Sequence, residues 1–310
     1  MVNKKGFFFS IVAIVLVMII LVVLNLKISN QSTNQFFGQE IRINSMNSFL
    51  IDLERDMNRA VYITSFRVIN ALNNDIAAKG EYIDSFNLRF EEAFFNGTIY
   101  SEESGVMVNS TFSDWILRVN NIAESYAINI NITPISIDVT LNDPWTINVS
   151  LNSTIYAYDY KNLTAYNYSH ITSTTLDIIG LEDPVYTIIS HGRLYNKINS
   201  TKVSSFTNNQ DTSNLMHFIN HSEYIPNTLA PDFIMRMEGN FSSSDNGIES
   251  IIYFPNFAEQ GIPYVEKSMI DYLYAGNFSP VLNTINNTYE SWLRIDNSHL
   301  YFYQVENLTI

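Results

Sequence analysis

Two of the five histidines have a spacing that could hold a metal ion. His217 and His221 are four residues apart, so they would share one face of a helix, and Glu223 follows as an oxygen donor for zinc. The zinc-protease pattern requires a glutamate directly after the first histidine, and this chain has Phe218 there. Surface or packing roles explain the pair better, and we predict no metal site.

Other residues with catalytic side chains form no recognisable motif. Ser190-His191-Gly192 brings serine and histidine together in sequence, but a catalytic triad is defined in space. The chain has no nucleophile elbow, phosphate-binding glycine loop, dinucleotide fingerprint or cysteine. Carboxylates distant in sequence could still meet as a calcium site or a glycosidase pair. We predict no catalytic residue and no cofactor, and an anchored extracellular hydrolase is the least favoured alternative.

Asparagine is common, and it recurs in the acceptor pattern for N-glycosylation. The sequon N-x-S/T occurs fourteen times, against about six expected if the 38 Asn and the 51 Ser and Thr were placed at random. An AT-rich genome that inflates Asn, Ile, Tyr and Phe is the alternative explanation. Some sequons lie inside strand-like runs, which argues against the use of all of them. The glycosylation candidates are Asn96, Asn109, Asn152, Asn162, Asn199, Asn240, Asn277 and Asn286.

An apolar segment near the N-terminus must position everything that follows it. Phe7–Leu24 contains no charge, and Ser10 is its only polar side chain. A helix of this length is about 27 Å long, close to the roughly 30 Å hydrocarbon core of a bilayer. Lys4 and Lys5 precede the segment, whereas only Lys27 follows it closely. This asymmetry predicts a transmembrane helix with a cytoplasmic N-terminus and an external C-terminal domain.

The residues before this segment form a short processing motif. Lys4-Lys5-Gly6 stands directly before Phe7, and no small-x-small site for an ordinary signal peptidase follows the apolar run. A basic residue, a glycine and a long apolar helix together resemble the class III signal peptide of archaeal type IV pilins and pilin-like proteins. The resemblance covers residues 1–28. It implies that a prepilin peptidase cuts between Gly6 and Phe7, and that Phe7–Leu24 first anchors the protein and then packs in a filament.

One residue departs from the bacterial version of this pattern. The fifth residue after the implied cut is Ile11, where the bacterial pattern has glutamate. The departure weakens the case for a major polymerising subunit. An uncleaved membrane anchor is the simpler alternative.

The charge balance excludes one class of partner. Outside the first 28 residues the chain has 14 basic and 31 acidic residues, a net charge of −17. Such a surface repels nucleic-acid phosphates and anionic lipid, so we expect no nucleic-acid function. With 46% hydrophobic residues the chain has enough apolar mass for a core without disulfides.

Helical periodicity resumes after a polar segment at Asn30–Gly38, where we expect a kink or hinge. One apolar stripe then recurs at three- and four-residue spacing and ends near Gly80: Met46, Leu50, Leu53, Met57, Val61, Thr64, Val68 and Leu72. A second helix is predicted over Tyr82–Phe95. A third is predicted to begin near Thr111 or Ser113, since Thr111 and Asp114 fit a capping box. Its apolar residues at helical spacing are Trp115, Val119, Ile122 and Tyr126.

From Ala127 the hydrophobic period changes from 3.6 to 2, which predicts an antiparallel meander of three or more long strands up to about residue 178. The alternation shifts by one residue at Pro134, which predicts a bulge or a bend at a sheet edge. Beyond residue 181 the pattern is weaker. It predicts strands at Val185–Ile189, Phe233–Met237 and Ile248–Phe254, and a short helix at Ser268–Tyr274.

The predicted architecture is α+β: a transmembrane helix continues as a long stem helix, the stem packs on the antiparallel meander, and a C-terminal α+β lobe follows. The expected divisions are 1–6 (cytoplasmic N-terminus or class III leader), 7–28 (transmembrane helix), 29–180 (stem helices and sheet) and 181–310 (lobe). The expected partners are the lipid bilayer and, through the resemblance, other pilin-like subunits and a prepilin peptidase. The alternative is a non-polymerising structural or adhesive glycoprotein of the cell surface.

Overall fold

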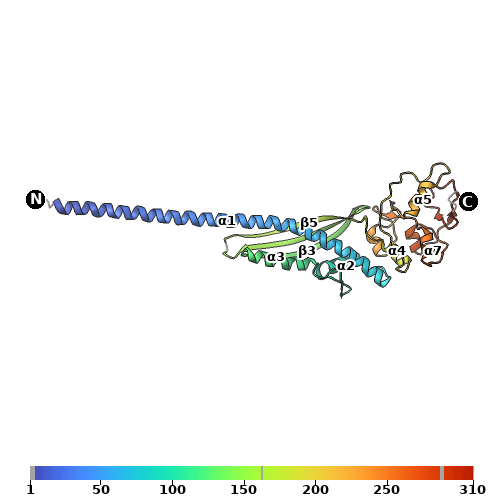
Figure 1. Cartoon of the computed structure of the whole chain (residues 1–310), viewed down its shortest axis with the longest axis horizontal. Helices are drawn as coiled ribbons and strands as arrows, with labels where there is room; N and C mark the ends of the chain where they lie inside the picture. Colours follow the sequence, from blue (N-terminus) through green and yellow to red (C-terminus); the bar gives the residue numbers. More distant parts are fainter. Residues whose placement is uncertain (1–3, 162, 287–289, 310) are drawn as a thin grey trace.

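The computed structural model describes residues 4–161, 163–286 and 290–309; within its first helix it describes no side chains for residues 4–12, 26 and 28–38. The molecule is elongated. A helical stem leads into a body of helices and three long strands, and a lobe of short elements follows at the end opposite the N-terminus (Figure 1). We call residues 39–178 the sheet body and residues 181–309 the C-terminal lobe. The predicted α+β class is confirmed.

The stem is α1 (Lys4–Lys79), a single helix of 76 residues. Its predicted apolar stripe over Met46–Leu72 is confirmed, because each of the eight side chains is at most 6% exposed. The helix ends just before Gly80, whose φ of +70° suits glycine. The kink expected at Asn30–Gly38 is wrong, since the helix continues through it. The segment contains no proline, and polar residues cost a helix only about 0.7 kcal/mol each or less.

The second helix, α2 (Phe86–Asn96), begins four residues later than predicted. The reason lies in the C-terminal lobe: the amide of Ile83 donates to the carbonyl of Met237 at 3.1 Å, so this segment pairs with the lobe and not with a helix. Gly97 ends α2 with a φ of +73°, and a two-strand hairpin follows, β1 (Thr98–Ile99) and β2 (Glu102–Glu103).

The third helix, α3 (Phe112–Ser125), begins as predicted. The hydroxyl of Thr111 accepts from the amide of Asp114 at 3.0 Å, and the Asp114 carboxylate accepts from the amide of Thr111 at 3.0 Å. This is the predicted capping box, which satisfies two amides that a helix start otherwise leaves without partners.

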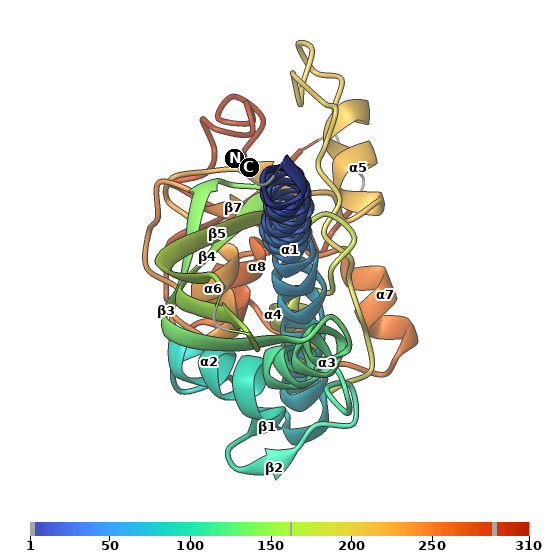
Figure 2. The ribbon, with the colours of Figure 1, turned by 90° about the vertical axis from the view of Figure 1, so that its left-hand side faces the viewer.

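The sheet is the predicted antiparallel meander, with strand order β3 (Ile128–Asp143), β4 (Thr146–Asp159), β5 (Ala165–Asp177). The register of β3 against β4 shifts between Pro134 and Ser136, which confirms the predicted bulge. α1 packs along β5 and α3 along β3, on the same face of the sheet (Figure 2). The opposite face carries no helix of the described chain.

The C-terminal lobe contains only short elements, and here the sequence pattern was misleading. The strands predicted at Val185–Ile189 and Phe233–Met237 are helices, because Asp183 and Asp232 cap their N-termini. The predicted strand at Ile248–Phe254 is a strand for two residues only. The lobe comprises α4 (Pro184–Ile189), α5 (Ser213–Asn220), β6 (Ile225–Pro226), α6 (Phe233–Met237), β7 (Ile248–Glu249), α7 (Phe254–Glu259), α8 (Asp271–Ala275), β8 (Leu282–Thr284) and β9 (Arg294–Asp296).

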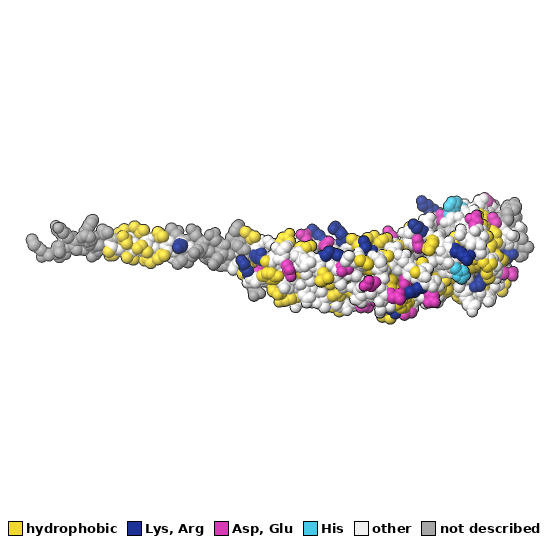
Figure 3. All heavy atoms as spheres, turned by 60° about the horizontal axis from the view of Figure 1, so that its bottom comes forward, with side chains coloured by type: hydrophobic (Ala, Val, Ile, Leu, Met, Phe, Trp, Pro, Cys, Tyr) yellow, Lys and Arg dark blue, Asp and Glu magenta, His cyan; other side chains and the backbone are white. Residues whose placement is uncertain are grey.

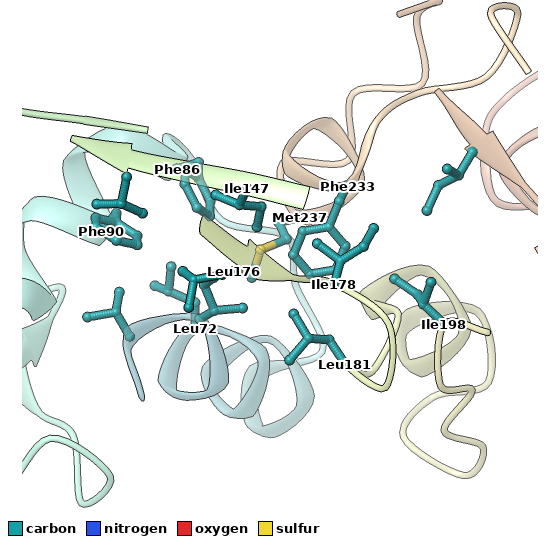
Figure 4. Close-up of a cluster of buried hydrophobic side chains, with 14 of the residues drawn as sticks. Leu72, Phe86, Phe90, Ile147, Leu176, Ile178, Leu181, Ile198, Phe233 and Met237 are labelled. Atoms are coloured by element: carbon teal, nitrogen blue, oxygen red, sulfur yellow. The ribbon is translucent and has the colours of Figure 1, made fainter. Parts of the chain in front are cut away.

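One apolar core runs through the junction of the two parts. Leu72 and Phe86 of the sheet body belong to the same buried cluster as Phe233 and Met237 of the lobe (Figure 4). Polar contacts reinforce the junction: the side-chain amide of Asn73 donates to the carbonyl of Glu182 at 3.1 Å. The lobe is therefore packed on the sheet body and not merely tethered to it.

The predicted membrane anchor falls partly outside the described residues. Among the residues that the structure describes, no helix combines the length and the apolar character needed to cross a membrane. The predicted span 7–28 includes residues 7–12, 26 and 28, whose side chains are not described, and the predicted leader includes residues 1–3, which are not described at all. The anchor stays a prediction.

Candidate functional site

A groove between α1 and α3 lies at the end of the sheet body nearest the stem. It encloses about 670 Å³, and its apolar lining includes Ile41, Phe49 and Leu53 from α1 and Ile122 and Tyr126 from the end of α3. The last two belong to the apolar stripe predicted for the third helix, and they are 53% and 60% exposed. Hydrophobic side chains gather on the surface at this end of the body (Figure 3).

A second groove continues along the same two helices, away from the stem. It encloses about 290 Å³ and is lined by Arg59 and Arg67 of α1 and by Arg118 of α3. Arg67 donates to the hydroxyl of Ser110 at 2.5 Å, and Arg118 donates to the carbonyl of Asn109 at 3.3 Å. We call it the arginine groove.

The arginine groove is an electropositive spot on an acidic protein. Among the described residues, no carboxylate lies within 4 Å of the three guanidinium groups, whereas Asp56 at the groove edge accepts a hydrogen bond from the Trp115 indole at 2.8 Å. Guanidinium groups arranged in this way can hold a carboxylate or a phosphate. Sequence reasoning missed the groove, because Arg118 joins the other two only through the packing of α3 on α1.

A buried network of charges connects three short helices of the C-terminal lobe. The Arg236 guanidinium in α6 bonds the carboxylates of Asp183, which caps α4, and of Asp271 in α8, the latter at 2.6 Å. All three side chains are fully buried. Burial raises the pKa of Asp271, although the neighbouring guanidinium opposes this. Burial alone would lower the pKa of Arg236, but the two carboxylates raise it well above its usual range.

A second buried charged group adjoins this network. His299 lies with Nδ1 2.8 Å from Asp296 and with Nε2 3.2 Å from Glu249, while Tyr303 donates to Glu249 at 2.7 Å. Burial lowers the pKa of His299, but the hydrogen bonds to the two carboxylates outweigh it and raise this pKa to about 10.

This histidine is unsuited to acid–base catalysis. At neutral pH it is protonated and so cannot act as a general base, and its side chain is 2% exposed, so a substrate does not reach it. We therefore assign both buried charge groups to holding the lobe together.

The histidine pair considered for zinc lies at the surface. The rings of His217 and His221 are stacked with centroids 4.1 Å apart, and Nδ1 of His221 is 2.8 Å from the carbonyl of His217. Glu223 instead accepts from the hydroxyl of Thr201 at 2.6 Å. No group of three metal-ligating side chains is found in the part of the chain that the structure describes. Ser190 is buried and bonds backbone groups of its own turn.

The predicted modification residues are scattered over the surface. Six glycosylation candidates are exposed: Asn96, Asn109, Asn199, Asn240, Asn277 and Asn286. Asn152 is half-buried in the central strand, and its side-chain oxygen is enclosed without a partner. Asn162 lies outside the described residues, and for the predicted cleavage residues Gly6 and Phe7 the structure describes only the helical backbone.

Comparison of the chain with protein-family models, with curated proteins and with solved structures finds no match. Its function must therefore be argued from its own residues.

Proposed function

We propose that this chain is a single-pass, membrane-anchored extracellular protein, and specifically a pilin-like, minor-pilin component of an archaeal type IV pilus-type surface system. One observation carries the proposal. α1 extends beyond the sheet body with eleven consecutive large apolar side chains, Ile14–Leu24, each between 48% and 64% exposed. The stem that bears them projects free of the rest of the molecule (Figure 1).

Water is a poor environment for this part of the stem. Moving one large apolar side chain out of water is favourable by about 1.5–3 kcal/mol, so the transfer of all eleven is favourable by on the order of 20 kcal/mol. A folded protein is stable by only about 5–15 kcal/mol. The segment therefore requires an apolar environment, which a bilayer supplies or which the same segments of other copies supply in a filament.

The leader motif supports the second of these environments. A cut between Gly6 and Phe7 would remove Lys4 and Lys5 and leave the apolar helix at the new N-terminus. The groove between α1 and α3 is a second apolar surface, which lies on the sheet body. Neighbouring copies packed through their stems would cover both surfaces. The protein would sit in the cell membrane before assembly, with its N-terminus cytoplasmic and its C-terminal lobe outside.

A structural or adhesive surface glycoprotein that does not polymerise is the second candidate. Ile11, at the position where the bacterial pilin pattern has glutamate, favours it. The arginine groove adds a specific observation, because it is a ready site for an anionic group on an outward-facing body. An anchored hydrolase is the least favoured candidate.

Mass spectrometry of the N-terminal peptide from native membranes tests the proposal. We expect a mature chain that begins at Phe7, and Gly6→Val should block this cut, because the peptidase of this family acts beside glycine. Gly105→Val is the matched control, since a side chain there meets no atom within 4 Å. A wild-type chain that still carries Gly6, or normal maturation of Gly6→Val, would refute the pilin-like assignment and leave the plain anchor.

A further inference from the structure

The face of the sheet that points away from the helices has an unusual composition. Six cross-strand rows of β3, β4 and β5 place eighteen side chains on it, from the row Asn129–Tyr158–Ala165 to the row Thr140–Asn148–Thr175. Thirteen of the eighteen are Asn, Ser or Thr, and Asp138 is the only charged one. The face is too polar for an apolar docking surface and nearly without charge on a strongly acidic protein.

Four sequons lie on this face for a geometric reason. A strand alternates its side chains with a period of two, and a sequon places its hydroxyl two residues after its asparagine. Each asparagine and its hydroxyl therefore point to the same side of the sheet. Asn131, Asn148, Asn152 and Asn167 all point outward. The sequence argument that strand-like runs disfavour sequon use does not apply where the sequon faces solvent.

Two of the four sequon asparagines occupy the positions best suited to glycosylation. Asn131 in β3 and Asn167 in β5 are exposed and lie on the two edge strands, and the register places both beside Tyr156 of the central strand. With strands about 4.8 Å apart, the two asparagines are about 10 Å apart. The Tyr156 and Tyr158 rings stand side by side between the edge strands, with centroids 5.6 Å apart.

We propose that Asn131 and Asn167 are N-glycosylation sites, and that the first sugars of the two glycans pack on Tyr156 and Tyr158. The proposal rests on the extracellular location proposed above. Sugar rings have apolar C–H faces that match aromatic rings, and their hydroxyls keep an uncharged face soluble. Asn152 is a poorer acceptor, because it lies in the central strand with its side-chain oxygen enclosed.

The transfer requires an oligosaccharide donor linked to a lipid phosphate. The asparagine amide nitrogen bonds to C1 of the first sugar and loses one proton, which passes to the surrounding water. The bond between C1 and the phosphate oxygen breaks, and the oxygen of the departing lipid phosphate keeps the electron pair. No oxidation or reduction takes place, and the sequon hydroxyl, of Thr133 or Ser169, assists the amide without being consumed.

Peptide mass spectrometry of the full chain, purified from native membranes, measures the glycan occupancy of each sequon. We expect Asn131 and Asn167 to be mostly occupied and Asn152 to be mostly bare. Thr133→Ala should lower occupancy of Asn131 by about tenfold or more and leave Asn167 unchanged. Thr140→Ala, on the same face but outside any sequon, is the matched control and should change neither. Tyr156→Ala should reduce protection of both glycans from endoglycosidase.

Two results would overturn the proposal. Bare Asn131 and Asn167 with an occupied Asn240, which is exposed outside the sheet, would refute it and leave the extracellular location standing. Bare asparagines at every sequon would refute it as well. Protease treatment of intact cells tests independently whether the C-terminal lobe is extracellular, because an external lobe is cleaved whether or not it carries glycans.

Discussion

The sheet body and the C-terminal lobe are stabilised in different ways. Among the described residues of the sheet body, Asp159 is the one charged side chain that is buried; it pairs with Arg42 at 2.5 Å. The lobe buries six charged residues and His299: Asp183, Glu223, Arg236, Glu249, Asp271 and Asp296. Its described helices have at most eight residues and its strands two or three, whereas the three main strands of the sheet body, β3, β4 and β5, have 13 to 16 residues.

The two parts of the molecule provide hydrogen-bond partners for their buried polar groups in different ways. Long helices and strands satisfy their own backbone hydrogen bonds and need only an apolar face to pack. Short segments leave many polar groups near the core, so side chains must supply the partners. Asp183 does this twice, since it caps α4 at the amide of Val185 and also binds Arg236. The stability of the lobe therefore depends on a few specific polar contacts, whereas the stability of the sheet body depends on many interchangeable apolar contacts.

The largest expected effect comes from removing the central cation of the lobe. Arg236→Met leaves the carboxylates of Asp183 and Asp271 buried without their counterion, and it should lower the free energy of unfolding by about 3–5 kcal/mol. Urea denaturation of the full chain in detergent measures this, and hydrogen exchange should locate the opening in the lobe.

Arg193→Met is the control for that substitution. Arg193 is exposed in the same lobe, and among the described residues its side chain donates only to the carbonyl of Gln260, so loss of this side chain should lower the free energy of unfolding by less than about 0.5 kcal/mol. Replacing Asp183 and Asp271 by asparagine in the Arg236→Met chain should recover part of the loss. Equal stability of Arg236→Met and wild type would show that the lobe does not depend on its buried cation.

The sheet body should respond to lost volume and not to lost charge. Leu151→Ala removes a fully buried side chain from β4 and should cost about 2–4 kcal/mol. Ile171→Ala on β5 removes an apolar side chain that is 65% exposed on the outer face, and it should change stability by less than about 0.5 kcal/mol. Chemical denaturation compares the two, and similar losses would show that the outer face is not solvated.

The lobe should also lose stability at alkaline pH. The folded-state pKa of His299 is about 10, above the ordinary 6.5. The contribution of this histidine to the free energy of unfolding is therefore fully present below pH 6.5 and is lost as the pH rises through 10. Between about pH 7 and pH 9 the free energy of unfolding should fall by on the order of 2 kcal/mol.

The variant His299→Gln isolates this effect. The variant should be less stable than wild type at neutral pH. Its stability should also fall less steeply between about pH 7 and pH 9, because it lacks the histidine that titrates there. Denaturation at a series of pH values gives both slopes. Parallel profiles for wild type and variant would mean that His299 does not titrate in this range.

The smallest effect concerns helix caps within the sheet body. Thr111→Ala removes the hydroxyl of the capping box and should cost about 1 kcal/mol. Ser85→Ala at the start of α2 is the matched control, because its side chain makes no capping hydrogen bond and its loss should cost only a few tenths of a kcal/mol. Thermal unfolding measures both, and a larger loss for Ser85→Ala would contradict this assignment of the caps.

The sequence by itself determined the stem stripe, the capping box, the antiparallel meander and the irregularity at Pro134. These features depend on residues a few positions apart, and their period of 3.6 or 2 repeats often enough to be unambiguous. It failed at Val185–Ile189 and Phe233–Met237, because a run of five residues with four apolar side chains fits a strand or a helix equally well, and a capping aspartate decided between them.

Only the tertiary structure decided which side chains meet. Asp183, Arg236 and Asp271 are 53 and 35 residues apart in sequence, and Arg118 reaches the arginine groove only because α3 packs on α1. The same holds for Asn131 and Asn167, which flank Tyr156 through strand register alone. Local periodicity tells which face of an element is apolar, but the partner of each polar group depends on how separate elements pack.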